Sequence, residues 1–356
     1  MQLYNKLSAK ERAQIIDKNS QERITLSFYK YFNLGNPLMF RDHIFIKWSK
    51  MDVLGRIYVA KEGINAQLSV PKESFDRFKQ SITEIVPLKK IRLNIALDHY
   101  SKSFLKLTIK IREKIVADGL DDLSFDVTKI GEHLDAQKFN QMLNHGNTVC
   151  IDMRNHYEGE IGYFKGAIKP DVDTFRESLN IIDEELKKNG KEKNYLMYCT
   201  GGIRCEKASA YLKHKGIKNV FQLEGGIIEY TRQVKEKELE NNFLGKNFVF
   251  DKRMGERISD EIVSNCHQCG NPCDSHVNCD NESCHLLFIQ CDECKEKMNS
   301  CCSVECKETI KLPYDKQKSL RRGKRNSHKI FKKGRSTKLK FKINSVSYTH
   351  LRAHET

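Results

Sequence analysis

The first third of the chain alternates apolar and polar positions in short segments. Four segments have the two-residue alternation of β-strands that cover one face of a core: residues 24–31, 56–60, 63–70 and 106–111. A fifth segment, residues 74–86, carries apolar side chains at helical spacing, and residues 37–50 look helical at their start and extended later. Four strands and two helices in about 100 residues predict a ferredoxin-like α+β domain over residues 22–115. Residues 1–21 precede it as a polar arm or short helix.

The middle of the chain has continuous apolar runs instead, at residues 148–154, 195–198 and 219–223. Such runs are typical of parallel strands buried on both faces, and helical segments alternate with them. The pattern predicts an α/β domain over residues 131–236, built on a parallel sheet with helices on both faces. An acidic linker at residues 116–130 precedes this domain, and a polar helix at residues 235–242 is predicted to follow it.

Composition limits the cellular setting. The chain has 356 residues, of which 39% are apolar and 31% are charged. No apolar run approaches the roughly 20 residues that span a bilayer, and residues 1–16 lack the apolar centre of a signal peptide. We therefore expect a cytoplasmic protein with no membrane partner. In that compartment, thirteen cysteines indicate metal ligands or catalysis rather than disulfides.

Positive charge is concentrated near the C-terminus. Residues 316–342 contain thirteen Lys or Arg and no acidic residue, in a chain whose net charge is +15. This composition predicts a disordered basic arm over residues 311–343 that binds phosphate backbones without sequence choice, although a simple solubility tail is the alternative. The candidate RNA-binding residues are Arg321, Arg322, Lys324, Arg325, Lys332, Lys333 and Arg335. Residues 344–356 depart from this composition and resemble a translated sequencing adapter, so we interpret them as a non-native tail.

The segment from Cys199 to Arg204 is the strongest candidate for catalysis. It follows a buried strand and precedes a helix, and it comprises Cys199, Thr200, Gly201, Gly202, Ile203 and Arg204. Glycines let successive backbone N–H groups converge on the sulfur, while the helix N-terminus and Arg204 add positive potential. All three effects favour the thiolate, which is the nucleophilic form. The alternative is a structural cysteine in a strand-to-helix turn.

The length of this loop indicates the kind of nucleophile. Four residues separate Cys199 from Arg204, whereas cysteine phosphatases have five. The shorter loop resembles that of the rhodanese family, whose cysteine carries one extra sulfur as a persulfide. Asp152, Arg154 and Glu158 resemble the start of the rhodanese signature, although Tyr163-Phe164 replaces its usual His-Ile. The resemblance implies that Asp152 and Arg154 brace the loop by salt bridges.

Ten of the cysteines lie between residues 266 and 306. C-x-x-C pairs direct two thiolates at one tetrahedral ion. We expect one four-thiolate site from Cys266, Cys269, Cys291 and Cys294, and a second from Cys279, Cys284, Cys302 and Cys306. This assignment interleaves the two sites, and a sequential pairing stays open. The predicted cysteine-rich module spans residues 246–310, with zinc as the default metal and an iron–sulfur cluster as the alternative.

The order of these parts resembles one family in particular. A ferredoxin-like domain, a rhodanese loop and a cysteine-rich basic tail, together with the segment Gly55–Ala66, resemble the bacterial rhodanese-family tRNA uridine hydroxylases. The resemblance implies hydroxylation of carbon 5 of the wobble uridine to 5-hydroxyuridine, with molecular oxygen as co-substrate. It implies that Cys199 is the essential cysteine and persulfide site, and that Arg204 is the loop arginine. It also implies tRNA as partner and an electron or sulfur donor that the sequence does not identify.

Two other functions fit the same residues. A rhodanese-type sulfurtransferase would move persulfide sulfur to an acceptor, and the loop alone does not distinguish it. A non-catalytic RNA-binding scaffold with a zinc module is the second, although such a protein would not need Cys199. No haem, flavin or non-haem iron motif that would activate oxygen is visible in the sequence.

Overall fold

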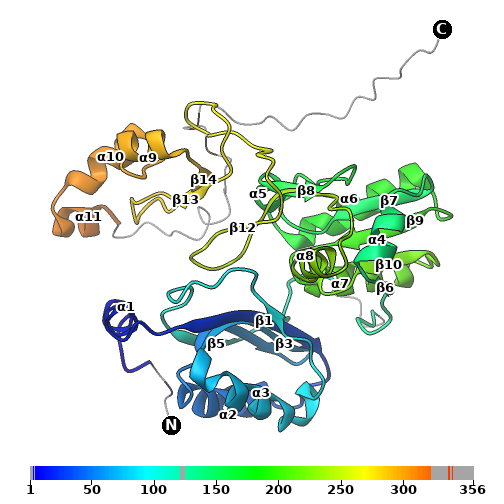
Figure 1. Ribbon diagram of the computed structural model, residues 1–356, viewed down its shortest axis with the longest axis horizontal. Coiled ribbons are helices and arrows are strands. Elements are labelled where there is room, and N and C mark those ends of the chain that lie inside the picture. The colour runs from blue at the N-terminus through cyan, green and yellow to red at the C-terminus, as the bar shows by residue number, and fades with distance from the viewer. Residues whose placement is uncertain (1–2, 4, 121–124, 322–335, 337–338, 340–356) are drawn as a thin grey trace. The chain divides into compact units, whose positions relative to one another are not determined.

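A computed structural model describes residues 3, 5–120, 125–321, 336 and 339 of the chain (Figure 1). It divides into two compact units, Met1–Asp260 and Glu261–Thr356. The first unit contains two sheet-based domains. The second contains the cysteine-rich segment.

The N-terminal domain is a five-stranded sheet in the order β4-β1-β3-β2-β5. Its strands are β1 (Arg23–Tyr31), β2 (Leu54–Ala60), β3 (Gly63–Pro71), β4 (Asn94–Ile95) and β5 (Leu107–Ile111). Its helices are α1 (Ala9–Lys18), α2 (Pro37–Ser49) and α3 (Phe75–Thr83), with 3₁₀ turns at Lys72–Ser74 and Val86–Leu88. Helices α2 and α3 lie against one face of the sheet (Figure 1). The first four strands have the ferredoxin-like order, which confirms the predicted class, and β5 joins β2 in parallel.

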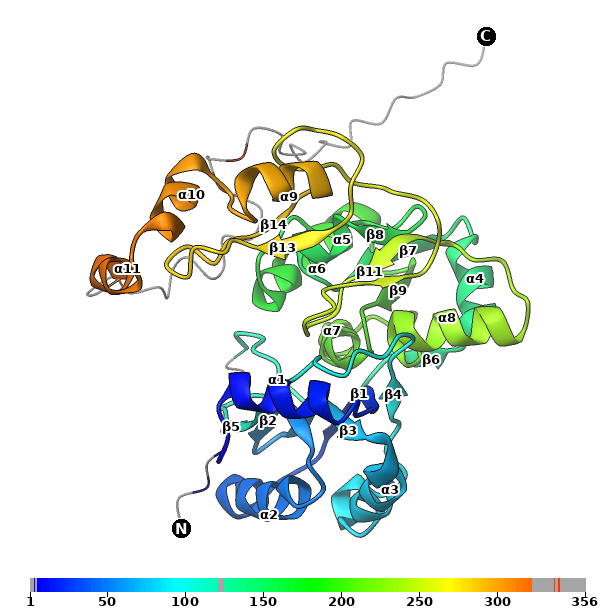
Figure 2. The same ribbon diagram turned by 60° about the vertical axis from the view of Figure 1, so that its left-hand side comes forward.

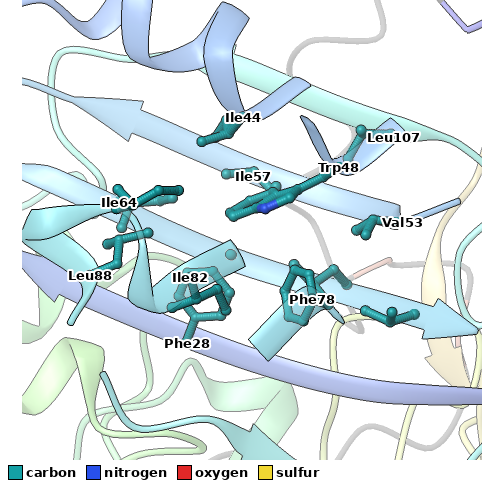
Figure 3. Close-up of a cluster of buried hydrophobic side chains, with 14 of the residues drawn as sticks. Phe28, Ile44, Trp48, Val53, Ile57, Ile64, Phe78, Ile82, Leu88 and Leu107 are labelled. Atoms are coloured by element: carbon teal, nitrogen blue, oxygen red, sulfur yellow. The ribbon is translucent and has the colours of Figure 1, made fainter. Parts of the chain in front are cut away.

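Helix α2 is longer than the sequence pattern indicated. Asn36 caps its start by accepting a hydrogen bond from the Met39 N–H (3.0 Å), and the helix continues to Ser49 rather than becoming extended. The reason is tertiary packing, because Ile44 and Trp48, one turn apart, are both fully buried. Trp48 lies at the centre of the core between this helix and the sheet (Figure 3), and its indole N–H donates to Ser81 Oγ at 3.1 Å.

The fourth ferredoxin-like strand is not the one that the sequence suggested. Residues 107–111 form β5 at the outer edge beside β2, whereas the short strand β4 lies beside β1 on the opposite edge. Strand β4 is only two residues long, which is too short for the alternation of apolar and polar positions that identifies a strand in sequence. This correction matters because β4 supplies Asn94 to the catalytic loop.

The second domain of this unit is a parallel four-stranded sheet in the order β6-β10-β9-β7. The strands are β6 (Glu132–Leu134), β7 (Thr148–Asp152), β9 (Asn194–Tyr198) and β10 (Val220–Leu223). The helices are α4 (Ala136–Leu143), α5 (His156–Gly159), α6 (Phe175–Asn189), α7 (Ile203–His214) and α8 (Gly226–Glu236). Figure 2 shows them from a second direction. Tyr195 and Met197 pack with α6 and α7, while Leu196 and Tyr198 pack with α4 and α8, so both faces are covered as predicted.

A small antiparallel sheet, β12-β11-β8, completes the first unit. Its strands are β8 (Gly162–Phe164), β11 (Phe243–Asn247) and β12 (Glu256–Arg257). The predicted polar helix at residues 235–242 is wrong, because α8 ends at Glu236. Glu238 has a φ of 51°, which stops the helix, and the chain then enters β11. Residues 246–260, assigned from sequence to the cysteine-rich module, belong to this first unit.

The second unit is small. It contains the hairpin β13 (His276–Asn278) and β14 (Leu287–Ile289), followed by α9 (Asp292–Met298), α10 (Val304–Lys311) and α11 (Tyr314–Arg321). Residues 311–321 were expected to begin a disordered arm, yet they include the end of α10 and all of α11. Across the described residues of both units, no helix has the length and apolarity needed to cross a membrane.

Candidate functional site

Cys199 directly follows β9, and the N-termini of α7 and α8 both lie at its loop. The Gly202 N–H donates to Cys199 Sγ at 3.1 Å. Gly202 has a φ of 101°, a conformation that favours glycine and that turns this N–H towards the sulfur. On the other side, the Ile227 N–H at the start of α8 donates to the Cys199 carbonyl at 3.0 Å. A Cβ at Gly226 would lie 2.5 Å from that same carbonyl, so the Gly225-Gly226 turn fits tightly beneath the loop.

The environment of Cys199 stabilises its thiolate. Burial alone would raise the pKa of this thiol, since the residue is fully enclosed. A hydrogen bond from the Cys205 thiol, the charge of Arg204 and the backbone N–H groups of Arg204 and Cys205 outweigh burial and lower the pKa to about 6. At neutral pH the sulfur is therefore mostly the nucleophilic thiolate.

Cys205 has the opposite tendency. Burial and the neighbouring Cys199 sulfur raise the pKa of its thiol well above the usual value. It therefore stays protonated and donates its S–H to Cys199. Cys205 therefore helps to stabilise the Cys199 thiolate.

Arg204 is held in place by Glu158, a residue that the sequence analysis noted only as part of a signature. The two guanidinium nitrogens lie 2.6 and 2.8 Å from the two carboxylate oxygens, and the pair is almost entirely buried. Burial opposes the charge on Glu158, but Arg204 keeps the pKa of this carboxyl below its usual value. This paired geometry fixes the direction in which Arg204 presents its charge to the loop.

Asp152 and Arg154, expected to brace the loop by salt bridges, form a salt bridge with each other. They pair with each other at 2.6 Å, and Asp152 also accepts the Tyr198 hydroxyl at 2.9 Å. Arg154 donates to the backbone carbonyls of Glu158 (3.5 Å) and Gly162 (2.6 Å). They therefore support the loop indirectly, because Arg154 holds the backbone segment that carries Glu158, and Glu158 in turn binds Arg204.

The N-terminal domain contributes side chains to the same loop. Asn94 Nδ2 donates to the Gly201 carbonyl at 3.2 Å, and the Tyr31 hydroxyl donates to the Ile203 carbonyl at 3.3 Å. The Tyr29 hydroxyl donates to Glu206 on α7 at 2.9 Å. None of these contacts is visible in the sequence, because the partners are separated by more than 100 positions. The alternation of β1 would only have placed Tyr29 and Tyr31 on one face.

The predicted linker also forms part of the site. Asp118 is buried, and its carboxylate lies 2.6 Å from Nζ of Lys207, which is itself buried on α7. Lys207 also lies 3.0 Å from Glu62, in the turn between β2 and β3. Residues 116–120 are therefore an ordered support for the catalytic helix, not a plain spacer. The buried Lys207 carried no recognisable signal in sequence.

A small cavity of about 50 Å³ lies beside the loop. Thr200 contributes to its wall from the catalytic loop, and Asn94 contributes from β4. Phe104 and Phe250 supply aromatic surface, while Asp251 and Arg253 add charge. The lining is mixed aromatic and polar, and the volume is well below the roughly 300 Å³ of the smallest ligand pockets, so the cavity as described does not hold a nucleobase.

In the second unit, the structure brings together the two interleaved cysteine groups. Within each group the sulfur atoms lie within 4.8 Å of one another, and the groups are Cys266, Cys269, Cys291 and Cys294, and Cys279, Cys284, Cys302 and Cys306. The closest sulfur pairs are 3.6 Å apart, which is too long for a disulfide. Four thiolates about 2.3 Å from a central zinc ion would be about 3.8 Å apart, so both groups fit a tetrahedral thiolate-bound metal.

The basic residues are only partly described. Arg321 lies on α11 and pairs with Glu282. The other candidate RNA-binding residues lie outside the described residues, and they are Arg322, Lys324, Arg325, Lys332, Lys333 and Arg335.

Two features define a rhodanese-like catalytic domain. One is the parallel sheet with helices on both faces, and the other is a cysteine thiolate separated from the loop arginine by four residues. Family profiles agree: a UPF0176 acylphosphatase-like domain matches residues 23–115, a rhodanese-like domain matches residues 135–233, and a rhodanese C-terminal domain matches residues 244–307.

Comparison with curated proteins shows which rhodanese-like family the chain belongs to. A protein of Photorhabdus laumondii named tRNA uridine(34) hydroxylase is 53% identical over 97% of this chain and 98% of its own length. Proteins of the same name from Yersinia pestis and Yersinia pseudotuberculosis are 53% identical over 94% of each chain. The chain belongs to the tRNA uridine(34) hydroxylase family. This confirms the resemblance that the sequence motifs carried.

Proposed function

We propose that this chain is an oxidoreductase that hydroxylates carbon 5 of the wobble uridine of tRNA, giving 5-hydroxyuridine. The observation that carries the proposal is the buried Cys199 sulfur, which accepts the Gly202 N–H and has a pKa lowered to about 6. Relatives that share almost the whole chain carry the name of this activity. The substrate is tRNA, and the protein works in the cytoplasm, where tRNA is found.

Cys199 acts as the nucleophile in this proposal. Its thiolate adds to carbon 6 of the uracil ring, so that the electron pair of the 5,6 double bond moves towards carbon 5. Carbon 5 then becomes electron-rich enough to react with an oxidant. Molecular oxygen is the co-substrate: one oxygen atom enters carbon 5, and the other leaves as water after taking up two electrons from a separate donor and two protons, one of which can be the hydrogen that carbon 5 loses.

Zinc is the metal that best suits the second unit. Closed sites with four cysteine ligands are typical of structural zinc, and the two groups contain cysteines alone. Zinc at such sites supplies folding energy rather than catalysis. The basic residues from Arg321 onwards contribute non-specific attraction to the tRNA backbone.

The test is mass spectrometry of wobble nucleosides from cells with and without the protein. Loss of 5-hydroxyuridine in the deletion strain, restored by the wild-type chain but not by Cys199→Ala, is the expected result. Loss of a thiolated nucleoside instead would favour a sulfurtransferase, the function that the four-residue rhodanese loop equally accommodates. An unchanged nucleoside profile would indicate the non-catalytic scaffold.

A further inference from the structure

The sheet of the N-terminal domain has two unlike faces. On one face, apolar side chains of β1, β2, β3 and β5 pack in the core with α2 and α3. The residues between them in sequence point to the opposite face, because successive side chains of a strand alternate. The pairing register aligns them in two rows across the strands, which are Ser27, Gln67, Arg56 and Thr108, and Tyr29, Asn65, Tyr58 and Lys110. No member of either row is acidic.

The catalytic loop lies over the β1 end of these rows. A Cβ at Gly202 would approach the Tyr29 hydroxyl to 2.6 Å, so the loop rests directly on this tyrosine. Gln67 on the neighbouring strand β3 lines the same small cavity as Thr200 of the loop. The polar face of the sheet therefore begins at the catalytic loop and continues from it across β3, β2 and β5.

Further from the loop, this face carries positive charge and one aromatic ring. Arg56, Lys110 and Arg112 are exposed, and Tyr58 is partly exposed. The Arg112 guanidinium lies 5.5 Å from the centre of the Tyr58 ring. Among the described residues, none of the three cations is paired with a carboxylate, and the nearby Glu62 is paired with Lys207 instead. We call these four residues of β2 and β5 the basic strip: Arg56, Tyr58, Lys110 and Arg112.

A ring bordered by unpaired cations suits single-stranded RNA. Every base has a flat face that stacks on an aromatic side chain, and the phosphates attract the cations around it. Ferredoxin-like sheets of other RNA-binding modules use aromatic residues in this way, and they stack two or three unpaired bases. Neighbouring strands lie about 4.8 Å apart, so Tyr58 lies two strands, or about 10 Å, from Tyr29 beneath the loop. That distance corresponds to about three stacked bases.

We propose that the basic strip binds the anticodon-loop nucleotides next to the wobble uridine, with one base stacked on Tyr58 and the phosphates held by Arg56, Lys110 and Arg112. The inference rests on the proposed function, which places the wobble uridine at Cys199. Charges alone attract any RNA backbone, whereas a ring at a fixed distance from Cys199 favours an unpaired loop over a duplex. The N-terminal domain thereby helps to select the position that is modified.

The test measures equilibrium binding of the full-length protein to a synthetic anticodon stem–loop with unmodified uridine at the wobble position. Tyr58→Leu keeps an apolar side chain but removes the aromatic ring, so the dissociation constant should rise about 10-fold with an unchanged salt dependence. Tyr58→Phe keeps the ring and should bind like wild type. Arg56→Gln and Lys110→Gln should each make the slope of log affinity against log salt shallower by about 0.7.

The matched controls lie outside the basic strip. Tyr163 on β8 is also a partly exposed tyrosine with a cation, Lys169, over its ring, and Arg77 is exposed on α3. Tyr163→Leu and Arg77→Gln should bind the stem–loop as tightly as wild type and with the same salt dependence. Thermal unfolding checks that each variant is folded.

Abasic nucleotides locate the stacked base. Removing the base of one loop nucleotide next to the wobble uridine should weaken wild-type binding about 10-fold and leave Tyr58→Leu unaffected, because both changes remove the same contact. Additive effects at every loop position would overturn stacking on Tyr58.

The remaining outcomes separate this proposal from the proposed function. Variants of the basic strip that bind the stem–loop like wild type would overturn the proposal, as would equal losses for the stem–loop and a fully paired duplex. Normal RNA binding with reduced formation of 5-hydroxyuridine would also overturn it and would indicate that the strip receives the electron donor. Because binding needs no chemistry, the predicted affinities from a wild-type chain that makes no 5-hydroxyuridine would reject the hydroxylation alone.

Discussion

Lys207 and Glu62 lie 3.0 Å apart, although 144 positions separate them in the numbering. Glu62 belongs to the β2–β3 turn, and Lys207 lies on the helix that begins at the catalytic loop. Glu62 lies in the segment Gly55–Ala66, which contributed to the resemblance to the tRNA uridine hydroxylase family, and Lys207 follows the rhodanese loop closely in sequence. Their contact shows that the N-terminal domain and the rhodanese-like domain build one site together.

Replacing Lys207 should destabilise the first unit. Lys207→Met removes one of the two lysine partners of the buried Asp118 carboxylate, while Lys114 remains, so it should cost about 1.5–3 kcal/mol of unfolding free energy. Chemical denaturation, followed by circular dichroism, measures this change. Lys213→Met, at a partly exposed position on the same helix, is the matched control and should change stability by less than about 0.5 kcal/mol. Equal effects would show that Lys207 contributes only packing.

Activity should follow the ionisation of Cys199. A pKa lowered to about 6 means that the thiolate is lost as pH falls through that value and is nearly complete above pH about 7. The ultraviolet difference absorbance between wild type and Cys199→Ala, recorded against pH, reports this titration. A midpoint near the ordinary cysteine value would contradict the loop geometry.

Cys205 and Arg204 should both influence that titration. Cys205→Ala removes the S–H donor to the thiolate, and Arg204→Gln removes the nearby charge, so each should raise the pKa of Cys199. The same difference absorbance measures both shifts. Cys150→Ala, a buried cysteine on β7, serves as the control and should leave the midpoint unchanged.

Glu158→Gln should reduce stability and activity, although it leaves both Cys199 and Arg204 in place. It leaves the buried Arg204 guanidinium without its carboxylate partner, which should cost about 3–5 kcal/mol of unfolding free energy and reduce hydroxylation. Thermal unfolding and the nucleoside assay check the two effects. Wild-type stability in this variant would mean that Arg204 finds another partner.

Metal removal should unfold the second unit selectively. Chelation frees the eight cysteines of the two groups, so local structure around β13, β14 and α10 should be lost. The expected readouts are near two zinc ions per chain by metal analysis and increased amide exchange restricted to residues after 260. Protein without bound metal, with its thiols freely reactive, would refute the ligand assignment.

Removing the basic C-terminal residues should weaken tRNA binding uniformly. Deletion of residues 322–356 retains α11 but removes most of the concentrated positive charge. The dissociation constant should rise and its dependence on salt should become shallower, while saturating tRNA is still modified at the wobble position. A salt dependence equal to that of the full chain would identify the segment as a solubility tail.

Local sequence patterns determine many of the strands, the catalytic loop and the cysteine pairs of this protein. The alternation in β1 and β3, the apolar runs of β7 and β9, the loop from Cys199 to Arg204 and the C-x-x-C pairs are each contained within a few neighbouring positions. Backbone propensity and ligand spacing act over that distance, so the sequence alone specifies them.

The rest depends on contacts between distant segments. Asn94 on a two-residue strand, Asp118 in an apparent linker and Glu158 beneath Arg204 become part of the site only when the sheets assemble. A buried charge is stable only beside its partner, and the partner is chosen by packing rather than by neighbours in sequence. The sequence therefore determined the nucleophile and its fold, and the tertiary structure decided which side chains surround it.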